Sequence, residues 1–535
     1  MARCLLSIGI VGARIDTRPD TGDFLLAQPH ANGALRPGAL HIAGARTAVL
    51  ATTVAAVGFV LLFAYVAVSR MAFPFDLEWG EGLFVDHVAR ILHRQQLYVR
   101  PSITFTPLVY TPGYYYAAAA AAKVFGLGIT TLRGVSLVCS LLLLCVLAAF
   151  GRREFGTTRE GLVLAGLFAA CYTIGGAWLD IARSDALLLL LVFSAAYLAR
   201  HGESMASLIA TGLLLTAAVL TKQVALTLAP PLLVYMFIRH GWRGLASAAT
   251  WLISLLVMVG LLQGTSKGWF LYYTFTVLSR AQTAWLDHPF VFWTSDLFGR
   301  FPVGTALGLL WCAVGWRLSS WRDWAFYGVF GAGLLVSTWE ARVHPGAWFN
   351  TLLPAYAFLS IAALRMAREI DRRVAGAGSL AIAVQLALLL YNPAKYIPAQ
   401  SEWNAAMELA DTIARVPGDV LFFDHAQWSA RGRKRSYVHE MAMRDVLAAH
   451  DQWGDSLVAQ IREAVSSEQF DVVILDSTGW FPLRLGRYYK PVATVATPRD
   501  LLKQRVGNPI YPATIFVPQV RHVDWPPRAP MEGAR

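Results

Sequence analysis

Charged residues are scarce in this chain. Only 15% of its 535 residues are Asp, Glu, Lys or Arg, against about 25% in soluble domains, and 56% are hydrophobic. This composition indicates a polytopic membrane protein. The formal net charge of +12 would suggest a nucleic-acid partner in a soluble protein, but no nucleic-acid-binding motif accompanies it. We therefore interpret the basic residues as arginine clusters that orient membrane helices.

Cysteine pairs and glycine-rich motifs are lacking as well. Four of the five cysteines lie in apolar runs and none forms a Cys-x-x-Cys pair, which argues against a disulfide framework or a zinc site. The sequence has no P-loop, and no Gly-x-Gly-x-x-Gly opens a helix after a strand. A soluble nucleotide donor held in such a cradle is therefore not indicated, and no signature of a catalytic serine or cysteine stands out.

Long apolar runs dominate the first 391 residues instead. The first run begins after a mixed stretch, residues 1–46, which is late for a cleaved signal peptide, so we predict a cytosolic N-terminal tail and a retained first span. Apolar length predicts about eleven transmembrane helices. They are expected at residues 48–69, 133–150, 161–178, 185–198, 206–220, 224–238, 246–263, 303–316, 324–337, 351–364 and 379–391.

The arginines set the predicted topology. If "LVYTPGYYYAAAAAAKVF" (108–125) is an interfacial helix and does not cross, every short basic turn falls on one side, as the positive-inside rule expects. These turns contain Arg152, Arg153, Arg159, Arg200, Arg239, Arg243, Arg317, Arg322, Arg365, Arg368, Arg372 and Arg373. The amino terminus is then inside and the carboxyl terminus outside. The predicted external segments are 70–128, 180–185, 264–301 and 339–350.

The composition changes after residue 391. Residues 392–535 contain an amphipathic stretch, "NAAMELADTIARV", and two apolar runs bounded by acids, "GDVLFFDH" and "FDVVILDS", which are typical of buried strands. We therefore predict a helical transmembrane domain, residues 47–391, followed by a small extracytoplasmic α/β domain, residues 392–535.

Carboxylates gather in the predicted external loops. Asp76, Glu78 and Glu81 follow the first span within "FPFDLEWGEG", and "LDIARSD" brings Asp180 and Asp185 to the same side. Such a cluster could act as a general base on an acceptor hydroxyl or hold a divalent cation. The alternative is a solvated loop that only ends the helix.

Basic residues at the same predicted edge suit a lipid phosphate. Lys222 lies between two apolar runs, and "TWEARVHPGAWFN" offers Arg342, His344 and Asn350. Arginine binds phosphate bidentately, and lysine binds it as a point charge. The alternative for Lys222 is snorkelling to the headgroups. The aromatic loop 264–301 could line an entry for a lipid tail or form an interfacial girdle without a ligand.

The first loop resembles a known family. "DLEWGEG", then "VDHVARIL" and "QLYVRPSITFTPLVYTPGYYY", and then "LRGVSL" resemble the GT-C superfamily of polytopic glycosyltransferases, in particular the protein-mannosyltransferase and aminoarabinose-transferase-like bacterial branch. The resemblance covers residues 48–391. It implies a GT-C-like fold in the bacterial cytoplasmic membrane, a polyprenyl-phosphate sugar as donor, catalytic acids in the first external loop and a juxtamembrane helix after them.

The resemblance also assigns residues. Glu81 matches the glutamate of the family's Asp-Glu pair, whereas Gly80 stands where the family has aspartate, so Asp76 or Glu78 is expected to supply the missing acid. Asp180 and Asp185 match the acid of the second loop. Arg133 matches an arginine that pairs with a loop acid. With Arg133 we group the residues expected to contact the donor phosphate, namely Arg183, Lys222, Arg342 and His344.

The resemblance implies an inverting transfer at the external face. A loop carboxylate deprotonates the acceptor hydroxyl, and the cations stabilise the departing phosphate. No metal cofactor is expected, with a divalent cation as the alternative. The acceptor stays open between a glycan, a lipid and a protein, and a polymerase or ligase of lipid-linked glycans would share the site. The other classes are a transporter or flippase, against which the missing inverted repeat argues, and a non-catalytic scaffold.

Overall fold

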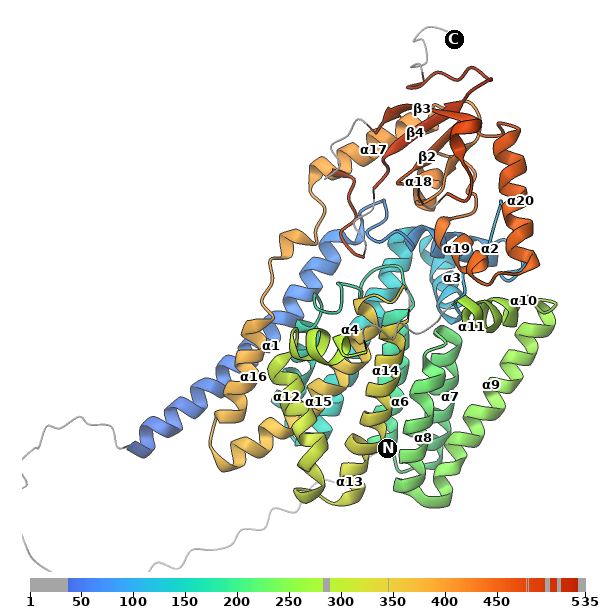
Figure 1. Cartoon of the computed structure of the whole chain (residues 1–535). Coiled ribbons are helices and arrows are strands. Elements are labelled where there is room, and N and C mark those ends of the chain that lie inside the picture. The colour runs from blue at the N-terminus through green and yellow to red at the C-terminus, as the bar shows by residue number, and fades with distance from the viewer. Residues whose placement is uncertain are drawn as a thin grey trace, which may run out of the picture.

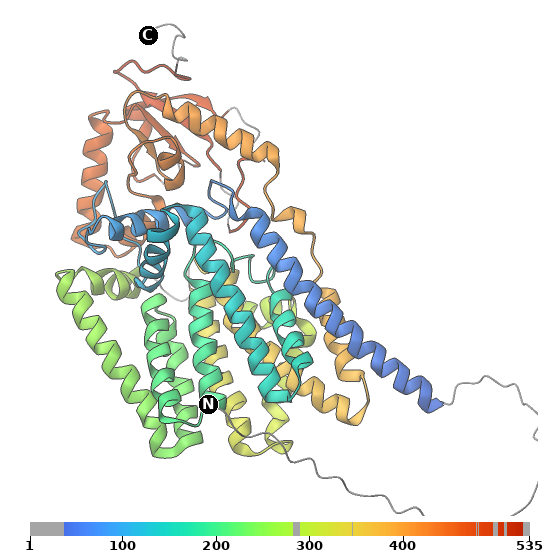
Figure 2. The same cartoon turned by 180° about the vertical axis from the view of Figure 1, so that it is seen from behind.

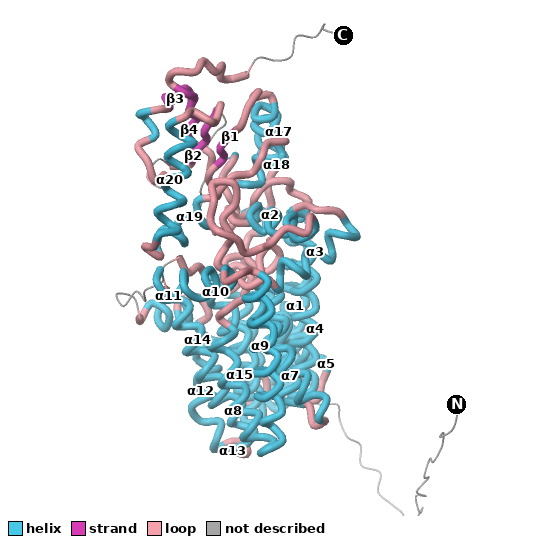
Figure 3. Tube along the Cα trace, turned by 90° about the vertical axis from the view of Figure 1, so that its right-hand side faces the viewer, coloured by secondary structure: helices cyan, strands magenta, loops and turns pink. Residues whose placement is uncertain are grey.

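The computed structural model describes residues 37–281, 289–344, 346–477, 479, 481–495, 501–507 and 511–527. A helical bundle forms one part of the molecule, and all four strands lie in a smaller unit at one end of it (Figures 1 and 3). The long first helix, α1 (Pro37–Met71), runs along the outside of the bundle (Figure 2).

Within the bundle, α4 (Ile129–Phe155) packs on α5 (Thr158–Ala170) and α6 (Asp185–His201), and α7 (Met205–Thr221) packs on α6 and α9 (Leu245–Thr265). Helix α1 packs on α5, and α12 (Pro302–Val314) on α15 (Leu353–Arg373). The remaining bundle helices are α8 (Ala225–His240), α13 (Trp321–Ala325), α14 (Gly331–Val343) and α16 (Ala377–Leu388).

Within the described part of the chain, four helices are long and apolar enough to cross a membrane: Gly44–Met71, Ile129–Phe155, Ala225–Thr265 and Phe349–Arg373. The number rises to six if each of two bent helix pairs is one span. Several expected spans are shorter helices, such as α6 with 17 residues. The membrane character is confirmed, and the number eleven stays a prediction, as do the domain boundaries.

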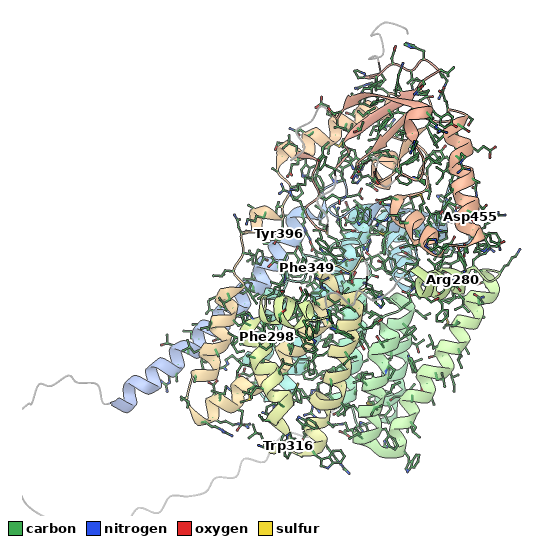
Figure 4. All side chains as sticks on the ribbon, in the orientation of Figure 1. Arg280, Phe298, Trp316, Phe349, Tyr396 and Asp455 are labelled. Atoms are coloured by element: carbon green, nitrogen blue, oxygen red, sulfur yellow. The ribbon has the colours of Figure 1, made fainter. Side chains whose placement is uncertain are left out.

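The basic turns come together at one end of the bundle. Arg153, Arg200, Arg239 and Arg365, from four of the turns predicted to be cytoplasmic, line one polar pocket with Glu154. The α/β unit lies at the opposite end, and Trp316 marks the end away from it in Figure 4. The two ends therefore differ as the arginine distribution predicts.

The expected span 161–178 is wrong in its second half. Helix α5 ends at Ala170, and residues 171–184 form a buried irregular segment in which Gly176 has a φ of +80°, a conformation that favours glycine. Its backbone is satisfied by side chains, because Arg70 donates to the Ala177 carbonyl over 2.7 Å and Ser140 to the Leu179 carbonyl over 2.5 Å. This segment carries the second group of acids inward.

Two short helices lie between the bundle and the α/β unit. These are α2 (Glu81–Leu92) and α3 (Gly113–Phe125), which pack on each other (Figure 1). Helix α3, with 13 residues, is too short to span a bilayer, which agrees with the prediction that residues 108–125 do not cross. Next to them, residues 269–281 form α10 (Trp269–Leu271), the π-helical turn η2 (Tyr272–Val277) and α11 (Leu278–Ala281).

The α/β unit contains a four-stranded mixed sheet in the order β1-β2-β4-β3. The two predicted strands are confirmed as β1 (Val420–Phe422) and β2 (Val472–Leu475), which pair in parallel with Val420 opposite Val472. Strands β4 (Thr514–Pro518) and β3 (Tyr489–Thr494) complete the sheet in antiparallel fashion. Its helices are α17 (Gln400–Ala414), which includes most of the predicted amphipathic stretch, α18 (Ala426–Arg431), α19 (Glu440–Ala448) and α20 (Gln452–Ser466).

Candidate active site

All five acids singled out from the sequence are buried at the junction of the bundle and the α/β unit. None of Asp76, Glu78, Glu81, Asp180 and Asp185 exposes more than 6% of its surface. An ionised carboxylate in such a place is costly unless it is paired and hydrogen-bonded. The partners of each acid therefore show what it can still do.

Glu81 has both oxygens engaged. Arg133 on α4 donates to Oε1 over 2.8 Å and to Oε2 over 2.5 Å, while the backbone N–H groups of Ala182 and Leu77 each donate over 2.7 Å. Burial alone would raise the pKa of Glu81, but Arg133 and these N–H groups hold it below its ordinary value.

Arg133 therefore serves Glu81 in this structure. Its remaining N–H groups donate to the backbone carbonyls of Met71, Phe73 and Phe75. The pairing with a loop acid matches the expectation from the family. The expectation that Arg133 contacts the donor phosphate finds no free N–H group here.

Asp180 is held in the same way. Arg70, at the end of α1, donates to both of its oxygens over 2.6 and 2.7 Å, and Tyr172 donates its hydroxyl over 2.9 Å. Arg70 and Tyr172 were not singled out from the sequence. Glu81 and Asp180 thus tie the two acidic loops to the bundle through bidentate arginines.

Glu78 accepts from the backbone N–H of Gly80 over 3.0 Å and lies 3.3 Å from Arg183. Burial raises the pKa of Glu78 to about 7, even though Arg183 lowers it. The same arginine explains glycine at position 80, because a Cβ there would lie 2.2 Å from its Nη1 atom. The Arg183 guanidinium fills the space that an aspartate side chain would need.

Asp185, at the start of α6, faces a pocket within the bundle. Its Oδ1 accepts from Lys222 over 2.7 Å and from Asn350 over 2.8 Å, and its Oδ2 is buried without a hydrogen-bond partner. Apolar side chains, among them Leu188 and Leu228, line the rest of the pocket. A polar end with one cation and an apolar wall fits a phosphate that carries a hydrocarbon chain.

Asp76 differs from the other four acids because no arginine or lysine binds it. Its Oδ1 accepts from the backbone N–H of Gly82 over 3.0 Å, and its Oδ2 is buried without a hydrogen-bond partner. The nearest cationic group is the imidazole of His425 in the α/β unit, whose Nδ1 lies 3.8 Å from Oδ2. Burial raises the pKa of the Asp76 carboxyl, and His425 opposes that rise.

His425 and its partner Asp476 were missed in the sequence, although a signal was present. His425 follows β1 in "FFDH" and Asp476 follows β2 in "ILDS". The carboxyl ends of two parallel neighbouring strands meet at one edge of a sheet, so these side chains were bound to lie close together. The observed distance from His425 Nε2 to Asp476 Oδ2 is 2.9 Å.

The predicted external loop 339–350, called the late loop below, contributes one residue to the contacts of the five acids. Asn350 reaches Asp185, but Arg342 is paired with Asp296 over 2.8 Å and His344 with Glu340 over 2.6 Å. Within the described part of the chain, neither Arg342 nor His344 forms a hydrogen bond or an ion pair with the five acids. Their predicted role at the donor phosphate stays a prediction.

The aromatic loop after α9 packs on the α/β unit. The Tyr272 hydroxyl donates to Asp451 over 3.2 Å, and the Trp269 and Trp453 rings meet edge to face. Arg280, labelled in Figure 4 below Asp455, lies 3.5 Å from Asp451. Residues 282–288 of the predicted loop lie outside the described residues. The described portion therefore joins the two parts of the molecule.

Among the described residues, no group of three or more His, Cys, Asp or Glu side chains is placed to hold a metal ion. The acids of the site are partnered by arginine, lysine, histidine and backbone N–H groups instead. The expectation about a metal stays a prediction.

The chain is similar to known proteins in a family model and in its fold. The family model described as dolichyl-phosphate-mannose-protein mannosyltransferase matches residues 109–263, and no curated protein matches the chain. ArnT from Cupriavidus metallidurans in the apo state shares the fold with a TM-score of 0.56 at 15% identity, over 86% of this chain and 98% of that one. The same protein bound to undecaprenyl phosphate gives a TM-score of 0.54 at 14% identity, over the same shares.

A more distant match, with a TM-score of 0.46 at 12% identity, is the Archaeoglobus fulgidus oligosaccharyltransferase in complex with Zn and sulfate, over 78% of this chain and 67% of that one. The ArnT fold and the family model are the two matches that bear on the prediction from the first loop. Together they confirm the resemblance predicted from the first loop: the chain resembles the GT-C polytopic glycosyltransferases and shares its fold with ArnT.

Proposed function

We propose that this protein is a GT-C-type membrane glycosyltransferase that moves a sugar from a polyprenyl-phosphate donor to a hydroxyl acceptor. The transfer takes place at the external face of a bacterial cytoplasmic membrane, with the α/β unit on the same side. Asp76 is the general base, and the sugar is transferred with inversion of its anomeric configuration. The family match and the ArnT fold support the reaction class, and the site supports the assignment of the base.

The observation that carries the assignment is the partner set of Asp76. A general base needs a free lone pair and a pKa raised towards the working pH. Asp76 has a buried Oδ2 without a hydrogen-bond partner and a pKa raised by burial. Glu81 and Asp180 have both oxygens bound by arginine, so neither can accept a proton without breaking a buried ion pair.

Asp185 is the second of the five acids with a buried oxygen that lacks a hydrogen-bond partner, but a lysine binds its carboxylate directly at 2.7 Å. Such a contact stabilises the anion and makes it a weaker base. We therefore assign Asp185, Lys222 and Asn350 to the donor side. Lys222 meets the phosphate there, and the apolar wall of the pocket meets the start of the lipid chain. The ArnT complex with undecaprenyl phosphate supports a ligand of this class.

The reaction is a single displacement. The acceptor oxygen forms a bond to the anomeric carbon as its proton passes to Asp76 Oδ2. The bond from the anomeric carbon to the phosphate oxygen breaks on the opposite face, which inverts the configuration. Negative charge builds up on the departing phosphate, and Lys222 with Arg183 stabilises it in a site that excludes water. The residues that bind the polyprenyl phosphate before the step thus also stabilise it as the leaving group.

The test is sugar transfer by the purified protein in proteoliposomes, with a panel of labelled polyprenyl-phosphate sugars and with lipid, glycan and protein fractions as acceptors. We expect consumption of at least one donor and, by NMR of the product, an inverted anomeric centre. Consumption with retention would contradict the single displacement. If no donor is consumed with any acceptor, the proposal fails, and a transporter or a scaffold becomes the better account.

A further inference from the structure

The α/β unit does more than cover the bundle: it inserts side chains at the candidate base. Gln427 at the start of α18 lies against Gly82, where a Cβ would be 2.6 Å from the Gln427 backbone nitrogen. The backbone N–H of Val506 donates to the Leu77 carbonyl over 2.9 Å, and His439 lies 3.2 Å from the Trp79 carbonyl. The loop that carries Asp76 is therefore enclosed by the α/β unit on several sides.

His425 is the residue of this unit that faces the Asp76 carboxylate. Its side chain is buried, with Nδ1 3.8 Å from the unpartnered Oδ2 of Asp76 and Nε2 2.9 Å from Asp476. Gln504 lies 3.3 Å from the same Nδ1. The imidazole is thus fixed between two carboxylates, one from each part of the molecule.

We propose that His425 is a positioning residue for the candidate base: its imidazole, oriented by Asp476, keeps the Asp76 carboxylate ionised and correctly placed, so that the site is complete only when the α/β unit is docked. This inference rests on the proposed function. It assigns to the α/β unit a part in the chemistry, which neither the family match nor the shared fold does.

The electrostatics agree with the geometry. Burial lowers the pKa of His425, but Asp476 and Asp76 outweigh burial and raise it to about 10, so the imidazole carries a positive charge at neutral pH. Without this charge the buried Asp76 would hold its proton more strongly. Other charged groups lie close by. The acid Glu402 and the cations Lys503 and Arg505 line the same pocket as Asp76 and His425, and Asp424, next to His425 in the chain, interacts with Glu440.

A second histidine of the α/β unit provides a matched control. His439 is also buried and also contacts the first loop, but it meets the Trp79 carbonyl rather than a carboxylate. Burial lowers the pKa of His439 to about 3, so it is neutral. A purely structural role for buried histidines in this interface would make the two residues behave alike.

The experiment is the pH dependence of sugar transfer in proteoliposomes for the full-length wild type, His425→Gln, Asp476→Asn and His439→Gln. Loss of a cation 3.8 Å away should raise the pKa of Asp76 and move the acidic limb of the profile upward by about one to three pH units in His425→Gln. Asp476→Asn, which weakens the hold on the imidazolium, should move the limb in the same direction by less. His439→Gln should leave it in place.

Thermal unfolding gives a readout that does not depend on activity. Because the pKa of His425 is raised from 6.5 to about 10, its stabilising contribution is complete below pH 6.5 and is lost as the pH rises towards 10. His425→Gln should remove this fall in the melting temperature, and His439→Gln should keep it. If His425→Gln folds poorly, Asp476→Asn carries the test.

The outcomes separate the two proposals. Transfer by the wild type with an acidic limb that His425→Gln and Asp476→Asn do not move would overturn the role of His425 and leave the proposed function intact. An equal shift in His439→Gln would also overturn it, because the effect would then be structural. Absence of transfer by the wild type would overturn the proposed function and, with it, the part assigned to His425.

Discussion

Two kinds of carboxylate share the junction between the bundle and the α/β unit. Glu81 and Asp180 are each bound on both oxygens by an arginine from the bundle, whereas Asp76 and Asp185 each keep one oxygen without a hydrogen-bond partner. Glu81 has no capacity left for a ligand or a proton, and a ligand on Asp180 would compete with a bidentate arginine. The comparison leads to our proposal that a free buried oxygen, rather than a place at the centre of the acidic cluster, marks the reactive group.

The largest effect is expected when an arginine is removed from one of the fully paired carboxylates. Arg133→Met leaves the buried Glu81 carboxylate without its guanidinium, and breaking a buried ion pair from one side costs about 3–5 kcal/mol. We expect a large drop in the melting temperature in detergent micelles. Arg372→Gln is the control, because Arg372 is 64% exposed in its pair with Glu369, and such pairs contribute about 0–1 kcal/mol. Equal effects of the two changes would contradict the account.

A change in the pocket at Asp185 should lower the affinity for the polyprenyl-phosphate donor. Lys222→Met removes the cation of the apolar pocket, and the loss of a hydrogen bond to a charged group costs about 1.5–3 kcal/mol, or roughly 10- to 100-fold in affinity. We expect this loss in the binding of the polyprenyl-phosphate donor, measured with the protein in nanodiscs. Lys123→Met, at an exposed lysine at the end of α3, should leave the affinity unchanged. Unchanged affinity in Lys222→Met would remove the phosphate from this pocket.

Glu78 should show its effect in the pH dependence of stability. Its pKa rises from 4.5 to about 7 on folding, so the folded protein binds its proton more tightly, and stability falls as the pH rises between these values. Glu78→Gln should flatten that part of the curve, by at most about 1.4 kcal/mol per pH unit. The difference between the wild-type and variant melting curves isolates this group. An unchanged slope would show that Glu78 is not protonated in this range.

The smallest effect is expected at the late loop. Arg342 is engaged by Asp296 and His344 by Glu340, so neither side chain is free at the acids. Arg342→Gln and His344→Gln should therefore change the KM for the donor by less than about threefold, or 0.7 kcal/mol. An increase of tenfold or more in either variant would show that the loop moves onto the phosphate during turnover, as the family resemblance implies.

Much of the fold could be predicted from the sequence. The apolar length of the runs, the arginine turns and the two acid-bounded strands depend on local patterns. The structure brings arginines from four of the five predicted basic turns together at one end and places β1 beside β2. The break after Ala170 was missed because residues 171–178 are apolar enough for a helix. The turn is revealed by Gly176 and Ala177 at positive φ and by the long-range bonds from Arg70 and Ser140.

The sequence predicted most residues of the site, but it did not predict which of them form ion pairs with each other. The acids and Lys222 follow from composition and position, but which arginine binds which acid depends on contacts across about fifty to a hundred residues, such as Glu81 with Arg133 and Arg70 with Asp180. Gly80 could be recognised as a departure, yet its cause, the guanidinium of Arg183, lies on another loop. His425 could not be assigned to the site from the sequence, because its contact with Asp76 depends on how the α/β unit packs on the first loop.

The central claim is that Asp76, the one acid of the five that no arginine or lysine binds, carries the chemistry. It is tested most directly by the rate of sugar transfer at saturating donor for Asp76→Asn, normalised to folded, donor-bound protein. The control is Asp86→Asn on α2, where the carboxylate accepts a hydrogen bond from Ser436 over 3.4 Å and has no part in the proposed site. The account predicts a loss of about 10²–10⁴-fold for Asp76→Asn, with unchanged donor affinity, and a near wild-type rate for the control. A wild-type rate in Asp76→Asn would contradict it and return the role of base to another acid of the cluster.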